Sequence, residues 1–252
     1  MKKLNKYYAG LFSILLKQLS KYERKADHET LHKIRITIKK IRSVFRLTGF
    51  CDKNFNERKH FHPLKKIFKD AGVIRESYIA GKLYEEYGIN KETDNNNLIY
   101  DNEKRMEDIS GFIKNTKRNC KVVYDKYFDT KQYPGNVSEE CYYEYFINRQ
   151  TELRNLVFPD LIEAKLHNAR RICKEITFLF EISSNSEKKT DPFFDKLQVM
   201  IGEWHDKIEL LKLMSYDDKN ITENKIKELE RSIGSEVSSI KELINAFYLN
   251  SN

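Results

Sequence analysis

The residues best suited to chemistry in this sequence are cations that share one face of a predicted helix, "LHKIRITIKKIRSVFRL" (31–47). At about 100° per residue, the segment divides into an apolar stripe and a basic stripe beside it. The apolar stripe comprises Leu31, Ile34, Ile38, Ile41 and Phe45. The basic stripe, called the ladder below, comprises His32, Arg35, Lys39, Arg42 and Arg46. Only Lys33 and Lys40 face the far side, so we predict a helix that packs by one face and presents cations along its flank.

The chemistry that such a ladder can perform is anion binding. Basic residues three or four positions apart repeat about every 5–6 Å along a helix face, which suits an extended anion with regularly spaced charges. Arginine donates paired hydrogen bonds to phosphate oxygens, and lysine acts as a movable point charge. A structural alternative stays open, because basic side chains beside an apolar stripe also lay their stems along the edge of a core.

The composition indicates that long helices carry the ladder. Only 9 Gly and 4 Pro occur among 252 residues, and 33% of residues are charged, which favours an all-α fold. Segments rich in turn formers, such as "YPGN" (133–136), divide the chain into eight predicted helices. These lie near 4–25, 29–48, 58–88, 97–131, 138–158, 160–183, 191–214 and 222–248. Asp191 followed by Pro192 predicts the N-cap and first residue of the seventh helix.

The second half of the sequence repeats motifs of the first. "LHNARRICKEITFLFEI" (166–182) aligns with the ladder segment at an offset of 135 residues. The matched pairs are Leu31 with Leu166, His32 with His167, Arg35 with Arg170, Lys39 with Lys174, Ile41 with Ile176, and Phe45 with Phe180. A later pair of segments, 64–83 and 194–213, aligns at an offset of 130. Its matched pairs are Lys66 with Lys196, Gly72 with Gly202, Arg75 with His205, and Glu76 with Asp206. Two ordered matches predict an internal duplication, with four helices in 1–131 and four in 138–248.

Positive charge is concentrated around the ladder. The formal net charge is +8, and residues 1–70 contain 19 Lys and Arg against 6 Asp and Glu. The remainder is mildly acidic, so the ladder belongs to a basic region that predicts an anionic partner. A biased genome would raise the lysine count, but it would not gather the cations on one helix face.

These motifs resemble the CHAD family, the conserved histidine α-helical domain, over nearly the whole chain, which we therefore treat as a single CHAD domain, 1–252. Each half of that family carries a helix of the form H-x-x-R-x-x-x-K/R-x-x-R. The residues from His32 to Arg42 fit this pattern fully, and those from His167 to Lys174 fit its first part. "GEWHD" (202–206) resembles a second family motif. The resemblance implies two four-helix bundles related by a pseudo-two-fold axis, a basic central channel or groove, and binding of inorganic polyphosphate without catalysis.

The candidate polyphosphate-binding residues come from the ladder, its counterpart and lysines that would widen the site. They are His32, Arg35, Lys39, Arg42, Arg46, His167, Arg170, Lys174, Lys17, Lys21, Lys66 and Lys196. The two halves differ in charge, because the second has Thr177 and Glu181 in place of two ladder arginines. The four cations of the ladder therefore correspond to a net charge of +1 at the aligned positions, with the histidines neutral. Two further pairs, interpreted as orienting groups, are Arg75 with Glu76 and His205 with Asp206. No catalytic residue, metal ligand or cofactor is predicted.

Three other functions remain alternatives to polyphosphate binding. A nucleic-acid or other polyanion-binding module would interleave aromatic residues with the basic stripe for base stacking. A triphosphate-cleaving enzyme would need acidic metal ligands beside the ladder, and the sequence shows no such cluster, which leaves the role of an accessory domain of a phosphohydrolase as the alternative. A neutral scaffold would have no use for the basic region.

The cysteines and the N-terminal segment bear on location. The four cysteines form no C-x-x-C pair and are interpreted as reduced thiols of a cytoplasmic protein, for which polyphosphate granules are a candidate location. "MKKLNKYYAGLFSILLKQL" (1–19) resembles a secretory signal, but Lys17 interrupts it and its leucines have helical spacing, so we predict a domain helix. No apolar run reaches the roughly 18 residues that span a membrane. The sequence does not predict the oligomeric state.

Overall fold

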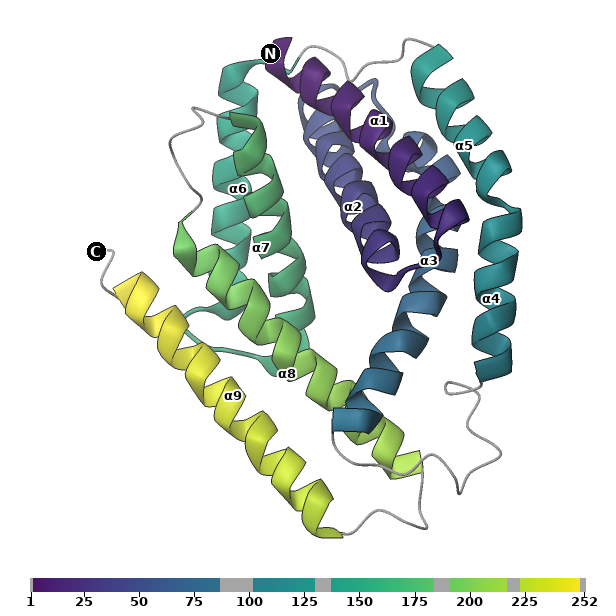
Figure 1. Ribbon diagram of the computed structural model, residues 1–252. Coiled ribbons are helices and arrows are strands. Elements are labelled where there is room, and N and C mark those ends of the chain that lie inside the picture. The colour runs from purple at the N-terminus through teal and green to yellow at the C-terminus, as the bar shows by residue number, and fades with distance from the viewer. Residues whose placement is uncertain (1, 87–101, 130–136, 184–190, 217–222, 250–252) are drawn as a thin grey trace. The chain divides into compact units, whose positions relative to one another are not determined.

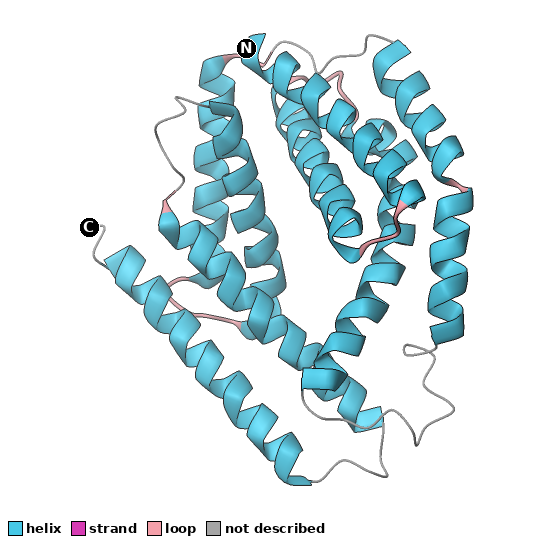
Figure 2. Ribbon diagram, viewed as in Figure 1, coloured by secondary structure: helices cyan, strands magenta, loops and turns pink. Residues whose placement is uncertain are grey.

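The computed structural model describes residues 2–86, 102–129, 137–183, 191–216 and 223–249, and its regular structure there is entirely helical (Figures 1 and 2). The helices are α1 (Lys2–Arg24), α2 (His28–Cys51), α3 (Glu57–Glu86), α4 (Asn102–Lys114), α5 (Thr116–Tyr124), the π-helical turn η2 (Asp125–Asp129), α6 (Glu139–Val157), α7 (Glu163–Ser183), α8 (Pro192–Tyr216) and α9 (Glu223–Leu249). The predicted all-α class is confirmed. None of these described helices combines the length and apolarity of a membrane span.

Side-chain caps set where two of the helices begin. Asp27 precedes α2, and its carboxylate accepts hydrogen bonds from the backbone N and the Oγ1 of Thr30, both at 2.7 Å. These bonds lower the pKa of Asp27 below its usual value. Asp191 accepts from the backbone N of Phe193 at 2.9 Å, and α8 begins at Pro192, so the predicted cap is confirmed.

One predicted helix, 97–131, is divided in the structure. α4 ends at Lys114 and α5 begins at Thr116, while residues 97–101 and 130–131 lie outside the described residues. Asn115 stands at the junction, and its Nδ2 donates to the Gly111 carbonyl at 2.8 Å. Asparagine side chains that bond the local backbone compete with the helical pattern, which the spacing of apolar residues does not reveal.

The described chain forms two compact units. Of the described residues, the first unit comprises 2–86, 102–129 and 137–143, and the second comprises 144–183, 191–216 and 223–249, so that α6 begins in the first and continues in the second. In the first unit, α1 packs on α2 and α2 on α3, while α5 lies against α1 and α3. All five residues of the predicted apolar stripe on α2 are at most 1% exposed. Their burial against α1, which buries Leu11, Leu15 and Leu19, confirms that both segments are core helices.

In the second unit, α8 packs between α7 and α9. The α7 core residues are Leu166, Ala169, Ile172, Cys173, Ile176 and Leu179, all fully buried. Aromatic rings connect α6 and the residue that follows it to the neighbouring helices. Phe146 of α6 lies 6.4 Å from Phe180 of α7, and Phe158, directly after α6, lies 5.5 Å from Tyr248 of α9, between ring centroids. α7 and α8 therefore form a packed pair within this unit, as α2 and α3 do in the first.

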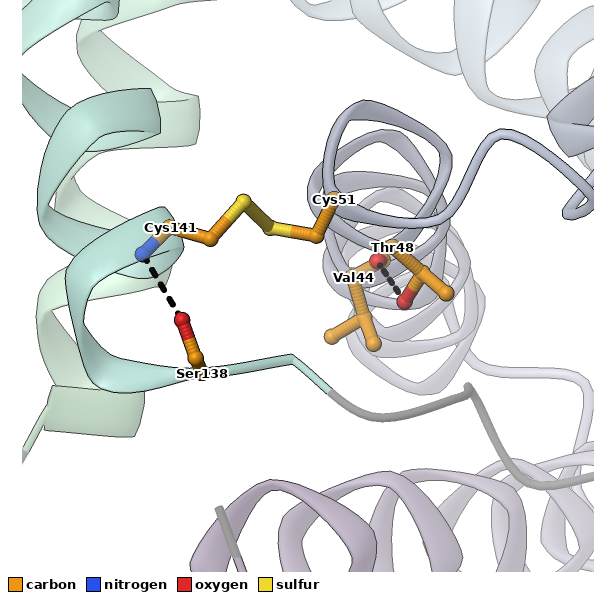
Figure 3. Close-up of a disulfide and its surroundings, with 5 residues drawn as sticks. All are labelled: Val44, Thr48, Cys51, Ser138 and Cys141. Carbon is orange, nitrogen blue, oxygen red and sulfur yellow. Dashed lines mark hydrogen bonds between the residues drawn. A yellow bond between two sulfur atoms is a disulfide. The ribbon is translucent and has the colours of Figure 1, made fainter.

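A disulfide joins Cys51, at the end of α2, to Cys141 in the first turn of α6, both within the first unit (Figure 3). The Cα atoms are 5.9 Å apart, and Ser138 Oγ accepts from the backbone N of Cys141 at 3.1 Å. The prediction of four reduced thiols is therefore wrong for this pair, whereas Cys120 and Cys173 are free. The two partners are 90 positions apart, and only the packing of the helix ends brings them within bonding range.

Candidate anion-binding site

The ladder lies along the edge of α2 that faces α3. Its five side chains are all half-buried, so they are neither fully solvated nor part of the core. Lys33, on the other side of α2, is exposed and pairs with Glu29 at 2.6 Å. The cations of the ladder are thus held at a helix–helix boundary, where groups of α3 fix their positions.

Arg35 packs against α3, on the Phe68 carbonyl and over Gly72, and this position is called its seat below. Its Nη1 donates to the Phe68 carbonyl at 2.8 Å, and its Cζ lies 4.3 Å from the centroid of the Phe68 ring. A Cβ added to Gly72 would lie 2.4 Å from Arg35 Nη1, so a glycine leaves the room that the guanidinium occupies. Burial lowers the pKa of Arg35, the nearby Glu76 carboxylate opposes that shift, and the Arg75 charge adds to it.

Arg170 of α7 is seated on α8 in the same manner. Its Nε donates to the Gln198 carbonyl at 3.2 Å. A Cβ added to Gly202 would lie 2.4 Å from Arg170 Nη2 and 2.9 Å from its Cζ. Burial lowers the pKa of Arg170, and the Asp206 carboxylate opposes the shift.

The two arginine seats agree with the alignment of the halves. Arg35 and Arg170 are 135 positions apart. The two glycines are 130 positions apart, and so are Phe68 and Gln198, whose carbonyls accept the arginine hydrogen bonds. Phe68 and Gln198 share no side-chain chemistry, so their equivalence is visible only in the structure. The seats are a local correspondence, and the duplication as a whole, with its pseudo-two-fold axis and channel, stays a prediction.

The far end of the ladder contacts the first turns of α3. The Nε atoms of Arg42 and Arg46 lie 3.3 Å and 3.5 Å from the same carboxylate oxygen, Oε1 of Glu57. The Cζ of Arg42 also lies 4.8 Å from the centroid of the Phe61 ring. Sequence reasoning missed Glu57, because the helix period relates residues within α2 and carries no information about the helix that packs against it.

A second cluster that the sequence did not indicate surrounds His28, the first residue of α2. Its ring stacks on Tyr78 with centroids 3.6 Å apart, and its Nε2 lies 3.1 Å from Arg75 Nη1. The His32 ring lies nearly parallel to it, 6.5 Å away between centroids. Burial, followed by the Arg75 charge, lowers the pKa of His28. Arg75 contacts His28, and both Arg75 and Glu76 act on the pKa of Arg35, in opposite directions.

In the second unit, the α7 residues aligned with the ladder differ from it beyond Arg170, at Thr177 and Glu181. Lys174 is half-buried, and Thr177 Oγ1 donates to the Cys173 carbonyl at 3.1 Å and lies 3.3 Å from Asp195 Oδ1. Glu181 is exposed. His167 is also exposed, with its ring centroid 5.6 Å from that of His205. Beyond the seated arginine, this face therefore offers few positive groups.

The four additional candidate lysines are all exposed. Lys66 pairs with Asp70 at 3.0 Å, one turn along α3. The Lys21 charge contributes to the lowered pKa of Asp27 and of Glu29, which places Lys21 near the first turn of α2. Lys17 and Lys196 lie on α1 and α8. Among the described residues, no group of three or more His, Cys, Asp and Glu side chains is placed to hold a metal ion.

Comparison with known proteins identifies the architecture. No protein-family model matches the chain, and no curated protein sequence matches it. The crystal structure of the CHAD domain from the plant Ricinus communis matches it with a TM-score of 0.64, over 96% of this chain and 92% of that chain. The chain has a CHAD-like fold. The two sequences are 14% identical, so this likeness concerns the fold alone, and it confirms the fold that the sequence motifs indicated.

Proposed function

We propose that this chain binds inorganic polyphosphate through the ladder and catalyses no reaction. The observation that carries the proposal is the row of half-buried cations along one edge of α2, held in place by α3. Polyphosphate is a flexible chain with about one negative charge per phosphate and has no bases to distinguish. A row of fixed donors recognises such a ligand better than a closed pocket, because successive phosphates meet successive cations.

The seated arginines retain donors for a ligand. A guanidinium has five N–H groups, so the bond from Arg35 Nη1 to Phe68 leaves others for phosphate oxygens. The Phe68 ring and the Gly72 seat restrict the rotamers of Arg35, which reduces the entropy lost when a ligand binds. The geometry therefore favours charge-assisted bonds to an anion that runs along α2.

The aromatic rings beside the ladder support phosphate over nucleic acid as the ligand. The Phe68 ring faces the cations of Arg35 and Lys39, at 4.3 Å and 5.9 Å from the ring centroid. Phe61 is 8% exposed and faces Arg42. Single-stranded nucleic acids are bound by rings with an open face on which bases stack. The Phe68 and Phe61 rings are instead in contact with the ladder cations, an arrangement that favours a ligand made of phosphates alone over one with bases to stack.

The fold supports the same proposal by resemblance. A CHAD-like fold accompanies the histidine–arginine motif of the ladder, and together they resemble a family whose members are linked to polyphosphate. A basic, helix-lined channel or groove remains part of the proposal. So does a location at polyphosphate granules, although the Cys51–Cys141 disulfide removes the argument for a reducing compartment from cysteine usage.

The test is a calorimetric titration of the purified chain with long-chain polyphosphate at several salt concentrations. We expect binding that withstands EDTA and weakens steeply as salt rises, because bound counterions are released. Duplex DNA at equal charge concentration should bind more weakly, and Mg²⁺ or Mn²⁺ should cause no release of phosphate. Equal affinity for DNA would favour the polyanion alternative, and turnover abolished by mutation of an acidic residue would contradict the non-catalytic proposal.

A further inference from the structure

Glu57 already occupies an anion position on the ladder. Its Oε1 lies between the Nε atoms of Arg42 and Arg46, at 3.3 Å and 3.5 Å. The carboxylate stands in the first turn of α3, where the helix dipole favours a negative charge. A carboxylate shared by two guanidinium groups makes the kind of contact that a phosphate would make there.

We propose that Glu57 is an internal competitor for polyphosphate, which makes the ladder favour long chains over short ones. This inference rests on the proposed function. A short anion at Arg42 and Arg46 must displace a carboxylate that is tethered beside them and therefore present at high effective concentration. A long chain also contacts Arg35 and Lys39, so it remains bound whether or not Glu57 has been displaced.

The exposures of the three side chains indicate the order of events. Arg42 is 44% exposed, so a ligand reaches it while Glu57 is still in place. Arg46 is only 18% exposed and Glu57 is 29% exposed, so Arg46 becomes available to a phosphate when the carboxylate turns away. The second unit has Thr177 at the position aligned with Arg42, and no such arrangement can form there. The competitor is therefore particular to the first unit.

The decisive variant is Glu57→Gln, which keeps the side-chain size and a hydrogen-bond acceptor but removes the charge. Its matched control is Glu29→Gln, which removes the same charge from a carboxylate that pairs with Lys33 on the opposite side of α2. Calorimetry with sodium triphosphate and with long-chain polyphosphate compares both variants with the wild-type chain. We expect Glu57→Gln to bind triphosphate roughly two- to fivefold more tightly, long chains to gain less, and Glu29→Gln to change neither.

A double variant protects the test against a folding artefact. Adding Arg46→Gln to Glu57→Gln should abolish the gain, because Arg46 is the arginine that becomes available when Glu57 is neutralised. Triphosphate affinity that is unchanged or lower in a normally folded Glu57→Gln variant overturns the inference while leaving the function intact. An equal gain in Glu29→Gln also overturns it, since net charge would then suffice. Binding of neither probe by wild type or Glu57→Gln rejects both the function and the inference, whereas binding that appears only in Glu57→Gln supports the competitor.

Discussion

The α2–α3 pair of the first unit and the α7–α8 pair of the second are alike at one point and different beyond it. Each seats an arginine, Arg35 or Arg170, over a glycine and against a backbone carbonyl of the following helix. The first pair continues with further cations. Lys39 and Arg42 lie near phenylalanine rings, and Arg42 and Arg46 share the Glu57 carboxylate. The second continues with Lys174, then with a threonine and a glutamate. The common part packs one helix against the next, and the part that differs carries the cations on which the proposed anion binding depends.

Comparing the two helix pairs separates a role in helix packing from a role in anion binding, although the sequence pattern of the cations is compatible with both. A guanidinium that fits over a glycine and bonds a carbonyl contributes to helix packing in both units, whatever it binds. The arginines that follow it in the first unit, Arg42 and Arg46, are replaced in the second unit by Thr177 and Glu181, so they are not part of the packing that the two units share. Polyphosphate affinity should therefore depend more on Lys39 and Arg42 than on the counterpart face.

The largest effect is expected from neutralising the outer ladder. The double substitution Lys39→Gln and Arg42→Gln should weaken polyphosphate binding by about 30-fold, because each partly desolvated cation–phosphate contact contributes about 1 kcal/mol. Lys174→Gln in the second unit should weaken it by about fivefold or less, since few cations surround it. Calorimetric dissociation constants at one salt concentration provide the measurement.

The control for this effect is Lys33→Gln with Lys40→Gln, which removes two charges from the far side of the same helix. Its affinity should fall by less than about threefold, through long-range electrostatics alone. All variants must retain wild-type helicity and melting temperature. Similar losses in the ladder variant and the far-side control would show that net charge, and not the ladder face, determines binding.

A smaller effect, on stability, should reveal how tightly each arginine is seated. Gly202→Ala should lower the free energy of unfolding by about 1–2 kcal/mol, because the new Cβ meets both Nη2 and Cζ of Arg170. Gly72→Ala meets only the tip of Arg35 closely, and the gain in helix propensity of about 1 kcal/mol should largely offset the strain. Urea unfolding gives both values, with fluorescence of the single tryptophan, Trp204, reporting on the second unit.

Matched controls exist for both glycines. Gly10 and Gly234 are helical glycines whose added Cβ would meet nothing within 4 Å, one in each unit. Alanine at either position should be neutral or stabilising. If Gly202→Ala proved as harmless as Gly234→Ala, the seat of Arg170 would be adjustable and the resemblance between the two units only superficial.

The smallest effect concerns pH and His28. Its pKa is lowered in the folded chain by burial and by Arg75, with a further contribution from Lys82, while Asp27 opposes the shift. The unfolded chain therefore binds the proton more readily, so the first unit should lose a little stability as pH falls below about 6.5. His28→Gln should show a smaller loss in urea unfolding followed by circular dichroism at pH 7.5 and 5.5. The position aligned with His28 in the second unit is Glu163, which lacks this titration. An equal loss of stability at low pH in unfolding monitored by Trp204 fluorescence would therefore show that His28 is not the cause.

The features that could be predicted from the sequence are those with a repeating or local signal. The 3.6-residue period identified α2 and its buried stripe, and Asp191 with Pro192 identified the start of α8. Glu57, His28 and the Cys51–Cys141 bond carry no such signal, because each depends on which helix ends meet in the folded chain. The alignment of the halves found both seating glycines, but only the packing shows the carbonyls that complete the seats.

The Cys51–Cys141 disulfide changes the topology of the polypeptide. Residues 51–141 form a covalent ring that includes α3, α4 and α5, and the segments before and after it are tails attached to that ring. Cutting one peptide bond within the ring opens it without releasing a fragment, whereas a cut in either tail separates the chain. A nick between α3 and α4 would consequently leave every element of the first unit covalently connected until a reductant is added.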